Sequence, residues 1–216
     1  MVLKIHGDAR SSCTKRVAVV LMEKAVPFEL VPVTMAGMKT AEYKAGMQPF
    51  GQIPVLEDDG YFLYESRAMG RYVAQKYANQ GTPDLIPLSG AVKEMGTFEK
   101  AMSIEATQFL AAEQLVSEVL FKPYMGGTTN PDEVTRLTAQ LAGMMDAYEQ
   151  ILSKTKYLAG DHITLADLYH LPYAEMITNR LKSDVITARP NVARWFQDIS
   201  TRPSWIAVKD SVNSTA

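Results

Sequence analysis

The chain has 216 residues, 47% of them hydrophobic and 21% charged, a composition typical of folded soluble proteins that excludes a mainly disordered chain. Its 22 basic and 24 acidic side chains give a formal net charge of −2, which does not favour binding to nucleic acid or an anionic membrane. No apolar run approaches the roughly 18 residues needed to span a bilayer, and the N-terminus does not resemble a signal peptide. The single cysteine, Cys13, cannot form an internal disulfide, which favours a reducing compartment. We therefore expect a cytoplasmic globular protein.

The first part of the chain alternates between strand and helix patterns. Residues 2–6 predict a short strand, and apolar residues then recur at helical spacing over residues 12–25. Residues 27–33 predict a second strand, whose two prolines indicate an edge strand or one that ends early. Residues 40–46 predict a short helix.

A hairpin and a third helix follow. Residues 53–57 and 61–65 flank an Asp-Asp-Gly turn, in which Asp-Gly accommodates the positive φ angles of a tight hairpin. Residues 66–78 return to helical spacing. The order is β-α-β-α-β-β-α, with the two central strands expected to be parallel and the last pair antiparallel.

The composition changes at residues 79–90, where Gly, Pro, Asn and Ser crowd together without a periodic apolar face. We expect an α/β domain at residues 1–80, a linker at 81–90 and an all-α domain at 91–216. The helices expected in the second domain cover residues 91–122, 131–153, 190–200 and 203–212, with a further helix start at 163–168. Asn130 is the predicted N-cap of the second of these helices, and Thr164 with Asp167 predicts a capping box.

Residues 48–68, QPFGQIPVLEDDGYFLYESRA, combine several features of a ligand site in one order. The bond between Ile53 and Pro54, just before a strand, is a candidate cis peptide. A cis proline would turn the N–H and C=O of Ile53 outward, where an extended peptide ligand could pair with them. Glu65 and Ser66 fall at the start of the next helix, where free N–H groups favour a carboxylate and Glu65 could hold an ammonium. Such a site suits an amino-acid-like group, whereas the alternative is that the two residues merely cap the helix.

These motifs resemble the glutathione transferase family, most of all its phi class of plants and fungi. The resemblance covers nearly the whole chain: SSCTKRV, QPFGQIPVLED, YESRA, NQGTP, FKP, LAGDHITLADLYHLPY and RPNVARWFQDI occur in order at family spacing. It implies a thioredoxin-like N-terminal domain that binds glutathione as cosubstrate without a metal, a helical C-terminal domain, and a homodimer.

The resemblance also implies roles for single residues. Ser11 stands where this class places its catalytic serine, and Ile53 with Pro54 stands where the family binds the cysteinyl backbone of glutathione. Glu65 and Ser66 match the pair that holds the γ-glutamyl end.

At the other end of the tripeptide, Gln52 matches a glutamine that helps to hold glutathione. Lys39 and Thr40 replace the usual His-Lys pair, so that Lys39 can supply a cation for the glycine carboxylate but Thr40 cannot supply a second. We expect weaker or differently oriented binding at that end.

Three adjacent side chains, Ser11, Ser12 and Cys13, compete for a chemical role. Our hypothesis is that the Ser11 hydroxyl donates to the sulfur of glutathione and stabilises it as a thiolate, which then attacks hydrophobic electrophiles or organic hydroperoxides. Ser12 is expected to cap the helix or to border the substrate pocket. Cys13 fits neither position of a C-x-x-C motif that starts at Ser11, and we expect it to pack within the first helix turn.

The electrophile pocket is expected between the domains, lined by apolar side chains of the helical part. Its candidate residues are Arg10, Ser12, Phe109, Leu115, Val119, Phe121 and Met176. Phe50 is a candidate anchor inserted into a partner subunit, and Tyr169 and His170 are expected to serve helix packing.

Two other functions remain open from the sequence. One is a non-catalytic or regulatory protein that keeps the glutathione site, and the other is a thiol transferase that works through Cys13. The retained Ser11 and the complete binding motif favour a conjugating enzyme.

Overall fold

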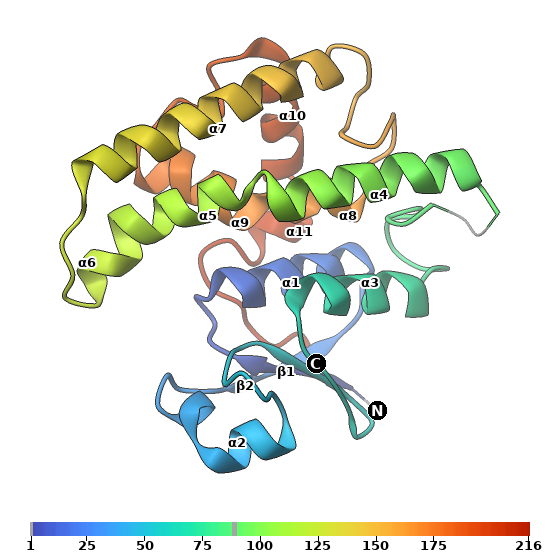
Figure 1. Ribbon diagram of the computed structural model, residues 1–216. Coiled ribbons are helices and arrows are strands. Elements are labelled where there is room, and N and C mark those ends of the chain that lie inside the picture. The colour runs from blue at the N-terminus through green and yellow to red at the C-terminus, as the bar shows by residue number, and fades with distance from the viewer. Residues whose placement is uncertain (1, 88–89) are drawn as a thin grey trace. The chain divides into compact units, whose positions relative to one another are not determined.

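The computed structural model describes residues 2–87 and 90–216, and the chain forms two compact units (Figure 1). One unit consists of Met1–Ile86 together with Arg202–Ala216, and the other of Pro87–Thr201. The two units divide after Ile86, within the residues 81–90 expected to form a linker, and the last fifteen residues belong to the first unit. Residues 88 and 89 of the predicted linker lie outside the described residues.

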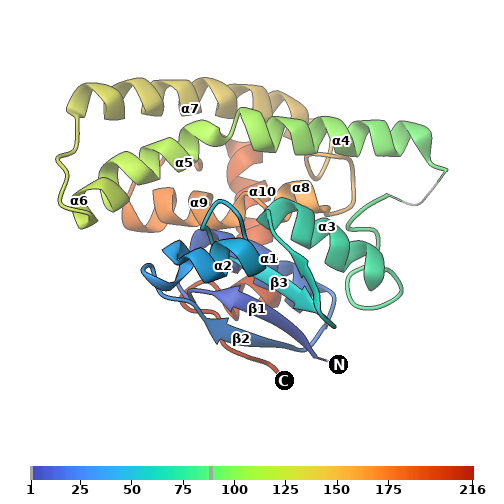
Figure 2. The ribbon, with the colours of Figure 1, turned by 60° about the horizontal axis from the view of Figure 1, so that its bottom comes forward.

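The first unit has a four-stranded mixed sheet in the order β2-β1-β3-β4. The strands are β1 (Leu3–Gly7), β2 (Phe28–Pro32), β3 (Val55–Asp58) and β4 (Tyr61–Leu63). Figure 2 shows β1 between β2 and β3, with β1 parallel to β2 and antiparallel to β3. The expectation of two parallel central strands is therefore wrong, because the parallel partner of β1 is the edge strand β2. As predicted, the strand with two prolines is an edge strand, since an edge tolerates a missing donor. The β3–β4 hairpin also forms as predicted, with positive φ angles of 53° at Asp59 and 80° at Gly60.

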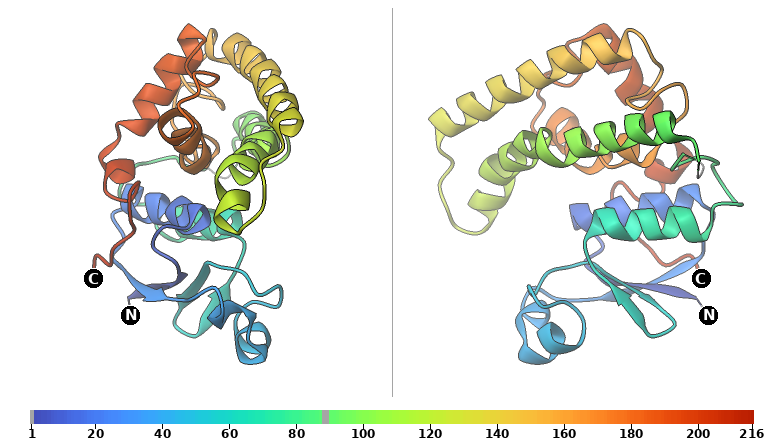
Figure 3. Two further views of the ribbon diagram at one scale, coloured as in Figure 1. Left: turned by 90° about the vertical axis from the view of Figure 1, so that its left-hand side faces the viewer. Right: turned by 45° about the vertical axis from the view of Figure 1, so that its right-hand side comes forward.

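The helices of this unit are α1 (Ser12–Glu23), a 3-10 turn η1 (Gly37–Lys39), α2 (Ala41–Gly46), α3 (Ser66–Lys76) and α11 (Pro203–Ile206). Helices α1 and α3 pack against each other along one face of the sheet, while α2 lies on the other side (Figures 1 and 3). The thioredoxin-like order predicted from the sequence is confirmed. Alternating residues of β1 and the apolar side of α1 supply the core, including Ile5, Val17 and Val20, all fully buried.

Part of the predicted linker docks on the end of α1. The Thr82 N–H donates to the Glu23 carbonyl at 2.7 Å, and the Lys24 ammonium donates to the Thr82 carbonyl at 2.8 Å. Gly81 has a φ of 62°, and a Cβ there would lie 2.2 Å from the Glu23 carbonyl oxygen. Only glycine fits at this close approach. The Gly and Pro residues of this stretch predict a loop, but they do not predict this contact.

The end of the chain also differs from the prediction. Instead of a helix over residues 203–212, α11 ends at Ile206, and the chain then runs back along the first unit. Val208 and Val212 are 2% and 1% exposed there. Burial of these two apolar side chains stabilises the non-helical path of the chain. Asp210, Ser211 and Asn213 also disfavour a helix here, because their side chains compete for backbone hydrogen bonds.

The second unit is helical throughout its regular structure. Its elements are α4 (Val92–Thr107), α5 (Leu110–Val116), a π-helical turn η2 (Ser117–Phe121), α6 (Lys122–Tyr124), α7 (Pro131–Leu152), α8 (Leu165–Leu168), α9 (Leu171–Glu175), a second π-helical turn η3 (Met176–Arg180) and α10 (Pro190–Ser200). The continuous helix predicted over residues 91–122 is wrong, because the chain breaks at residues 108–109. The Phe109 N–H donates to the carbonyl of Ile104, five residues back, and the Phe109 ring lies 4.4 Å from the His170 ring in the core.

Both predicted helix caps are confirmed. Asn130 Oδ1 accepts from the Asp132 N–H at 3.0 Å at the start of α7, and Asp167 Oδ2 accepts from the Thr164 N–H at 2.9 Å in a capping box. Tyr169 and His170 are fully buried, in agreement with the expected packing role. Among the described residues, no helix is both long and apolar enough to cross a membrane.

Candidate functional site

Ser11 forms the N-cap of α1, at the end of the turn that leads from β1 into the helix. Its φ and ψ are −62° and 132°, and its Oγ accepts a hydrogen bond from the Thr14 N–H at 3.4 Å. Extended dihedrals are typical of an N-cap, because they let the side chain reach the free N–H groups of the first turn. Ser12, for which capping was one expectation, is instead the first residue of the helix and is 6% exposed.

The Ser11 hydroxyl keeps its proton available, because it donates to no residue that the structure describes. A serine oxygen has two lone pairs and one proton, so accepting from Thr14 does not use the proton. The unpaired N–H groups and the dipole of α1 also favour negative charge in front of the helix. This end of α1 is therefore suited to an anionic sulfur.

Cys13 is half-buried in the first turn of α1, as expected, and is a free thiol. Arg16 Nη1 lies 3.6 Å from Cys13 Sγ and donates to Ser66 Oγ at 2.9 Å. Arg16 is 1% exposed, so this guanidinium joins the start of α1 to the start of α3 inside the unit. Sequence reasoning missed it, because a charged residue in a helix usually indicates a solvated face.

The cis peptide bond predicted between Ile53 and Pro54 is present. Pro54 lies beside the start of α1, since a Cβ added to Gly7 would lie 3.3 Å from Pro54 Cβ and 2.8 Å from Thr14 Oγ1. The N–H and C=O of Ile53 make no hydrogen bond with any described residue. Both groups are free to pair with the backbone of an extended ligand.

The loop before Ile53 is held by three side chains from η1, α2 and the residues after α2. Lys39 Nζ donates to the Gly51 carbonyl at 2.7 Å, and the Tyr43 hydroxyl donates to the Gln52 carbonyl at 2.8 Å. Gln48, 2% exposed, accepts from the Gln52 N–H at 3.3 Å. Gln52 itself is exposed. The sequence analysis assigned no role to either Tyr43 or Gln48, although Gln48 is the first residue of the motif QPFGQIPVLED.

Thr40, the departure from the family pattern, has a local role. It is the N-cap of α2, and its Oγ1 accepts from the Tyr43 N–H at 3.2 Å and donates to the Gly37 carbonyl at 3.0 Å. A threonine cap stabilises a helix by about 1 kcal/mol relative to alanine. Thr40 therefore stabilises the helix that holds Gln52, although it supplies no cation.

Glu65 and Ser66 stand at the start of α3, where the sequence placed them. Glu65 occupies the N-cap position of α3 and is exposed, but its side chain makes no capping hydrogen bond. Its φ of 69° is left-handed, a conformation that costs a non-glycine residue about 1–3 kcal/mol and is concentrated at binding sites. Ser66 is 7% exposed and accepts from Arg16.

The predicted pocket residues fall into two groups. Phe109, Leu115 and Met176 are buried, at 2%, 2% and 9% exposure. Val119 is half-buried and Phe121 is 36% exposed, and both lie in η2. The Arg10 side chain is 79% exposed, and its Nε lies 3.8 Å from Asp8 Oδ1. Their part in an electrophile pocket stays a prediction.

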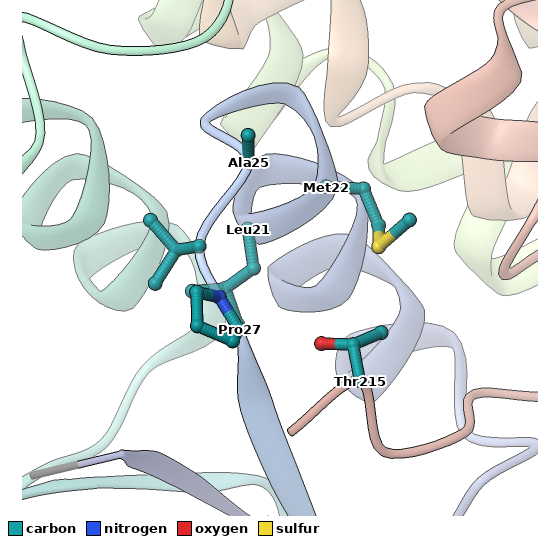
Figure 4. Close-up of a pocket in the computed structure, with 6 residues that line it drawn as sticks. Leu21, Met22, Ala25, Pro27 and Thr215 are labelled. Atoms are coloured by element: carbon teal, nitrogen blue, oxygen red, sulfur yellow. The ribbon is translucent and has the colours of Figure 1, made fainter.

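A separate cavity of about 310 Å³ lies at the C-terminal end of α1 (Figure 4). It is lined by Leu21, Met22, Ala25, Val26, Pro27 and Thr215. None of the predicted site residues lines it. Over residues 2–87 and 90–216, no three His, Cys, Asp or Glu side chains gather in a way that would hold a metal ion.

The chain matches known proteins over nearly its whole length. Residues 5–81 match the family model described as glutathione S-transferase, N-terminal domain, and residues 112–203 match that of the C-terminal domain. Glutathione S-transferase F9 of Arabidopsis thaliana is 41% identical over 208 residues, which cover 95% of each chain. Glutathione S-transferase hmp2 of Hypomyces subiculosus is also 41% identical, over 95% of this chain and 97% of its own.

Solved structures give the same result. Glutathione transferase F7 of Populus trichocarpa superposes with a TM-score of 0.88 at 39% identity, over 96% of this chain and 97% of its own. Glutathione S-transferase I of maize, solved with an atrazine glutathione conjugate, has a TM-score of 0.88 at 32% identity over 97% of both chains. Both family models and the plant phi-class relatives agree, and the chain belongs to the glutathione S-transferase family.

Proposed function

We propose that the protein binds glutathione on its first unit and transfers the glutathione thiolate to hydrophobic electrophiles. The observation that carries the proposal is the grouping of three complementary features around the start of α1. These are the Ser11 hydroxyl with its free proton, the unpaired backbone of Ile53 beside Pro54, and Glu65 at the start of α3.

Each feature suits one part of the tripeptide. The exposed Glu65 carboxylate would bind the ammonium of the γ-glutamyl group, and Ser66 with the first N–H groups of α3 would bind its carboxylate. The N–H and C=O of Ile53 would pair with the cysteinyl backbone. Lys39 would bind the glycine carboxylate, because an ammonium that donates once to Gly51 has two further protons. Gln52 would add a polar contact from the loop.

The proposed role of Ser11 is to stabilise an anion. A free thiol has a pKa of about 8.5, and lowering it by two units requires about 2.7 kcal/mol of preference for the thiolate. A hydroxyl hydrogen bond to sulfur and the N-terminal end of α1 both act in that direction. Ser11 donates and is not itself deprotonated.

The transfer step needs no reactant other than glutathione and the electrophile. With a chlorinated nitroaromatic, the thiolate forms a C–S bond at the carbon that carries chlorine, and chloride leaves with the electron pair of the broken C–Cl bond. The thiol proton passes to solvent when the thiolate forms. We propose that Arg10, Ser12, Phe109, Leu115, Val119, Phe121 and Met176 contribute to the pocket for the electrophile.

Three assays test the proposal against its alternatives: conjugation of a chlorinated nitroaromatic, reduction of an organic hydroperoxide, and reduction of a mixed disulfide. We expect conjugation in the wild type and in Cys13→Ala. Turnover of the mixed disulfide alone, lost in Cys13→Ala, would favour a thiol transferase. Glutathione binding without turnover in any assay would favour a non-catalytic binding protein.

The protein is proposed to act as a cytoplasmic homodimer. Phe50 supports an anchoring role, because it is 66% exposed and is held in an edge-on contact with Tyr64 at 6.3 Å between ring centroids. Aromatic side chains are enriched in protein–protein interfaces. Sedimentation equilibrium of Phe50→Ala against the wild type tests this role. A wild-type monomer, or a variant dimer of unchanged affinity, would contradict it.

A further inference from the structure

The chain beyond α11 makes two separate sets of contacts within the first unit. Residues 207–212, here called the C-terminal segment, contact the region around Ser11. Residues 213–216, here called the C-terminal tail, contact the edge strand β2. Only the first set concerns the proposed site.

The C-terminal segment is bonded on both sides of Ser11. The Val212 N–H donates to the Ala9 carbonyl at 2.9 Å, two residues before Ser11. The Lys15 ammonium donates to the Lys209 carbonyl at 2.8 Å, four residues after Ser11. Lys15 is 4% exposed and Val212 is 1% exposed, so neither contact is a surface interaction of the kind that solvent readily replaces.

The turn between these two anchors determines where the Ser11 hydroxyl lies. The Ser11 N–H donates to the Asp8 carbonyl at 3.1 Å, and the Lys15 N–H donates to the Ser11 carbonyl at 3.0 Å. The Ser11 side chain itself has only the long contact of 3.4 Å with the Thr14 N–H. The backbone on either side of Ser11 is therefore fixed more firmly than its hydroxyl.

We propose that the C-terminal segment is a positioning element for Ser11, and that Lys15 is a positioning residue that acts through the Lys209 carbonyl. This inference rests on the proposed role of Ser11. A hydrogen bond to a thiolate depends steeply on distance and angle, so a small movement of the turn weakens it. The segment would thus affect ionisation of the thiol although none of the residues proposed to hold glutathione lies in it.

The C-terminal tail supplies a matched control. Thr215 Oγ1 accepts from the Phe28 N–H at 3.1 Å, and Ser214 Oγ accepts from the Leu30 N–H at 2.9 Å. These bonds stabilise the same end of the chain on the same unit, but they lie on β2 and not on the turn around Ser11. If the C-terminal segment had only a structural role, removing either set of hydrogen bonds would have a similar effect on the melting temperature and on the pH profile.

The test compares Lys15→Met with the double variant Ser214→Ala/Thr215→Val, both in the full chain. The readouts are the melting temperature, the KM for glutathione and the pH profile of kcat/KM for the electrophile at saturating glutathione. For Lys15→Met we expect about a tenfold loss of kcat/KM near pH 6.5, less than the roughly hundredfold that a misplacement of 1 Å can cause. Its profile should shift to higher pH while the KM for glutathione stays within about twofold. The double variant should lower only the melting temperature.

Two shortened chains give a second test of the same inference. A chain ending at Val212 keeps the bond to the Ala9 carbonyl, and one ending at Asp210 loses it. We expect a normal pH profile for the first and a shifted one for the second; if the shorter chain does not fold, Lys15→Met decides.

Ser11→Ala is measured in the same assay. If Ser11→Ala leaves the pH profile unchanged, the proposed function of Ser11 fails. If Ser11→Ala shifts the profile but Lys15→Met does not, or if the double variant shifts it equally, the positioning role is overturned.

Discussion

Glu23 at the end of α1 connects three distant parts of the first unit, and its replacement by glutamine should destabilise that unit strongly. Its carboxylate is 2% exposed and accepts from Arg202 Nε at 2.6 Å and from Arg202 Nη2 at 2.7 Å. It also accepts from the hydroxyls of Thr82 and Ser204. Glu23→Gln removes the charge and presents an amide N–H₂ to groups that are themselves donors.

The size of the effect follows from burial. Removing one partner of a buried ion pair costs 3–5 kcal/mol, and since the Arg202 side chain is 25% exposed we expect about 2–3 kcal/mol for Glu23→Gln. At 2–4 °C per kcal/mol for a chain of this size, the melting temperature should fall by about 4–12 °C. Thermal unfolding by circular dichroism measures this shift. The exposed Glu29→Gln is the control, with an expected change of less than about 0.5 kcal/mol.

The same pair predicts a pH dependence. Burial by itself would raise the pKa of Glu23, but hydrogen bonds from Arg202, Ser204 and Thr82 outweigh it, so the pKa lies below its ordinary value of 4.5. A carboxyl with a lowered folded-state pKa contributes stability above its unfolded pKa and loses it as the pH falls through the folded value. The stability difference between wild type and Glu23→Gln should therefore be constant near neutral pH and narrow below about pH 4.5. A difference under 1 kcal/mol at pH 7, or one that grows in acid, would refute the reasoning.

Two further predictions test the loop and the docked linker. Tyr43→Phe removes the hydrogen bond to the Gln52 carbonyl, worth about 0.5–1.5 kcal/mol, and should raise the KM for glutathione about two- to tenfold with little change in kcat; a fall in kcat alone would contradict this. Gly81→Ala should destabilise the protein by more than about 2 kcal/mol in urea unfolding, because the new Cβ would lie 2.2 Å from a carbonyl oxygen. Gly143→Ala in α7, with no neighbouring atom within 4 Å, should be neutral or stabilising by up to about 1 kcal/mol, and equal effects of the two substitutions would be inconsistent with the docked linker.

Local signals predicted most of the fold. Pro at the edge strand, Asp59-Gly60 at the hairpin and Asn130 at the start of α7 each act through their own backbone or that of a near neighbour. Their structural consequence is therefore visible in a short stretch of sequence. The break before Phe109 could not be predicted in this way, because it depends on packing against His170, which lies sixty-one residues further along the chain.

Part of the candidate site could be proposed from the sequence because its residues lie in short motifs. Ser11, Ile53, Pro54, Glu65 and Ser66 occur in motifs, and the structure places them at the start of α1 and α3 and beside the cis proline.

The residues that support them act over long separations or through the backbone. Arg16 reaches Ser66, Tyr43 holds a carbonyl, and Lys15 bonds a residue 194 positions away. Contacts of this kind leave no periodicity or spacing in the sequence.

The most direct test of the central claim is the ionisation of glutathione bound to the enzyme. Ultraviolet absorbance of the thiolate, titrated against pH, gives the pKa of the bound thiol in the wild type, in Ser11→Ala and in Cys13→Ala. We predict a value about two units below the 8.5 of a free thiol in the wild type and Cys13→Ala, and a return toward 8.5 in Ser11→Ala. A bound thiol with the same lowered pKa in Ser11→Ala as in the wild type would contradict the proposed role of Ser11.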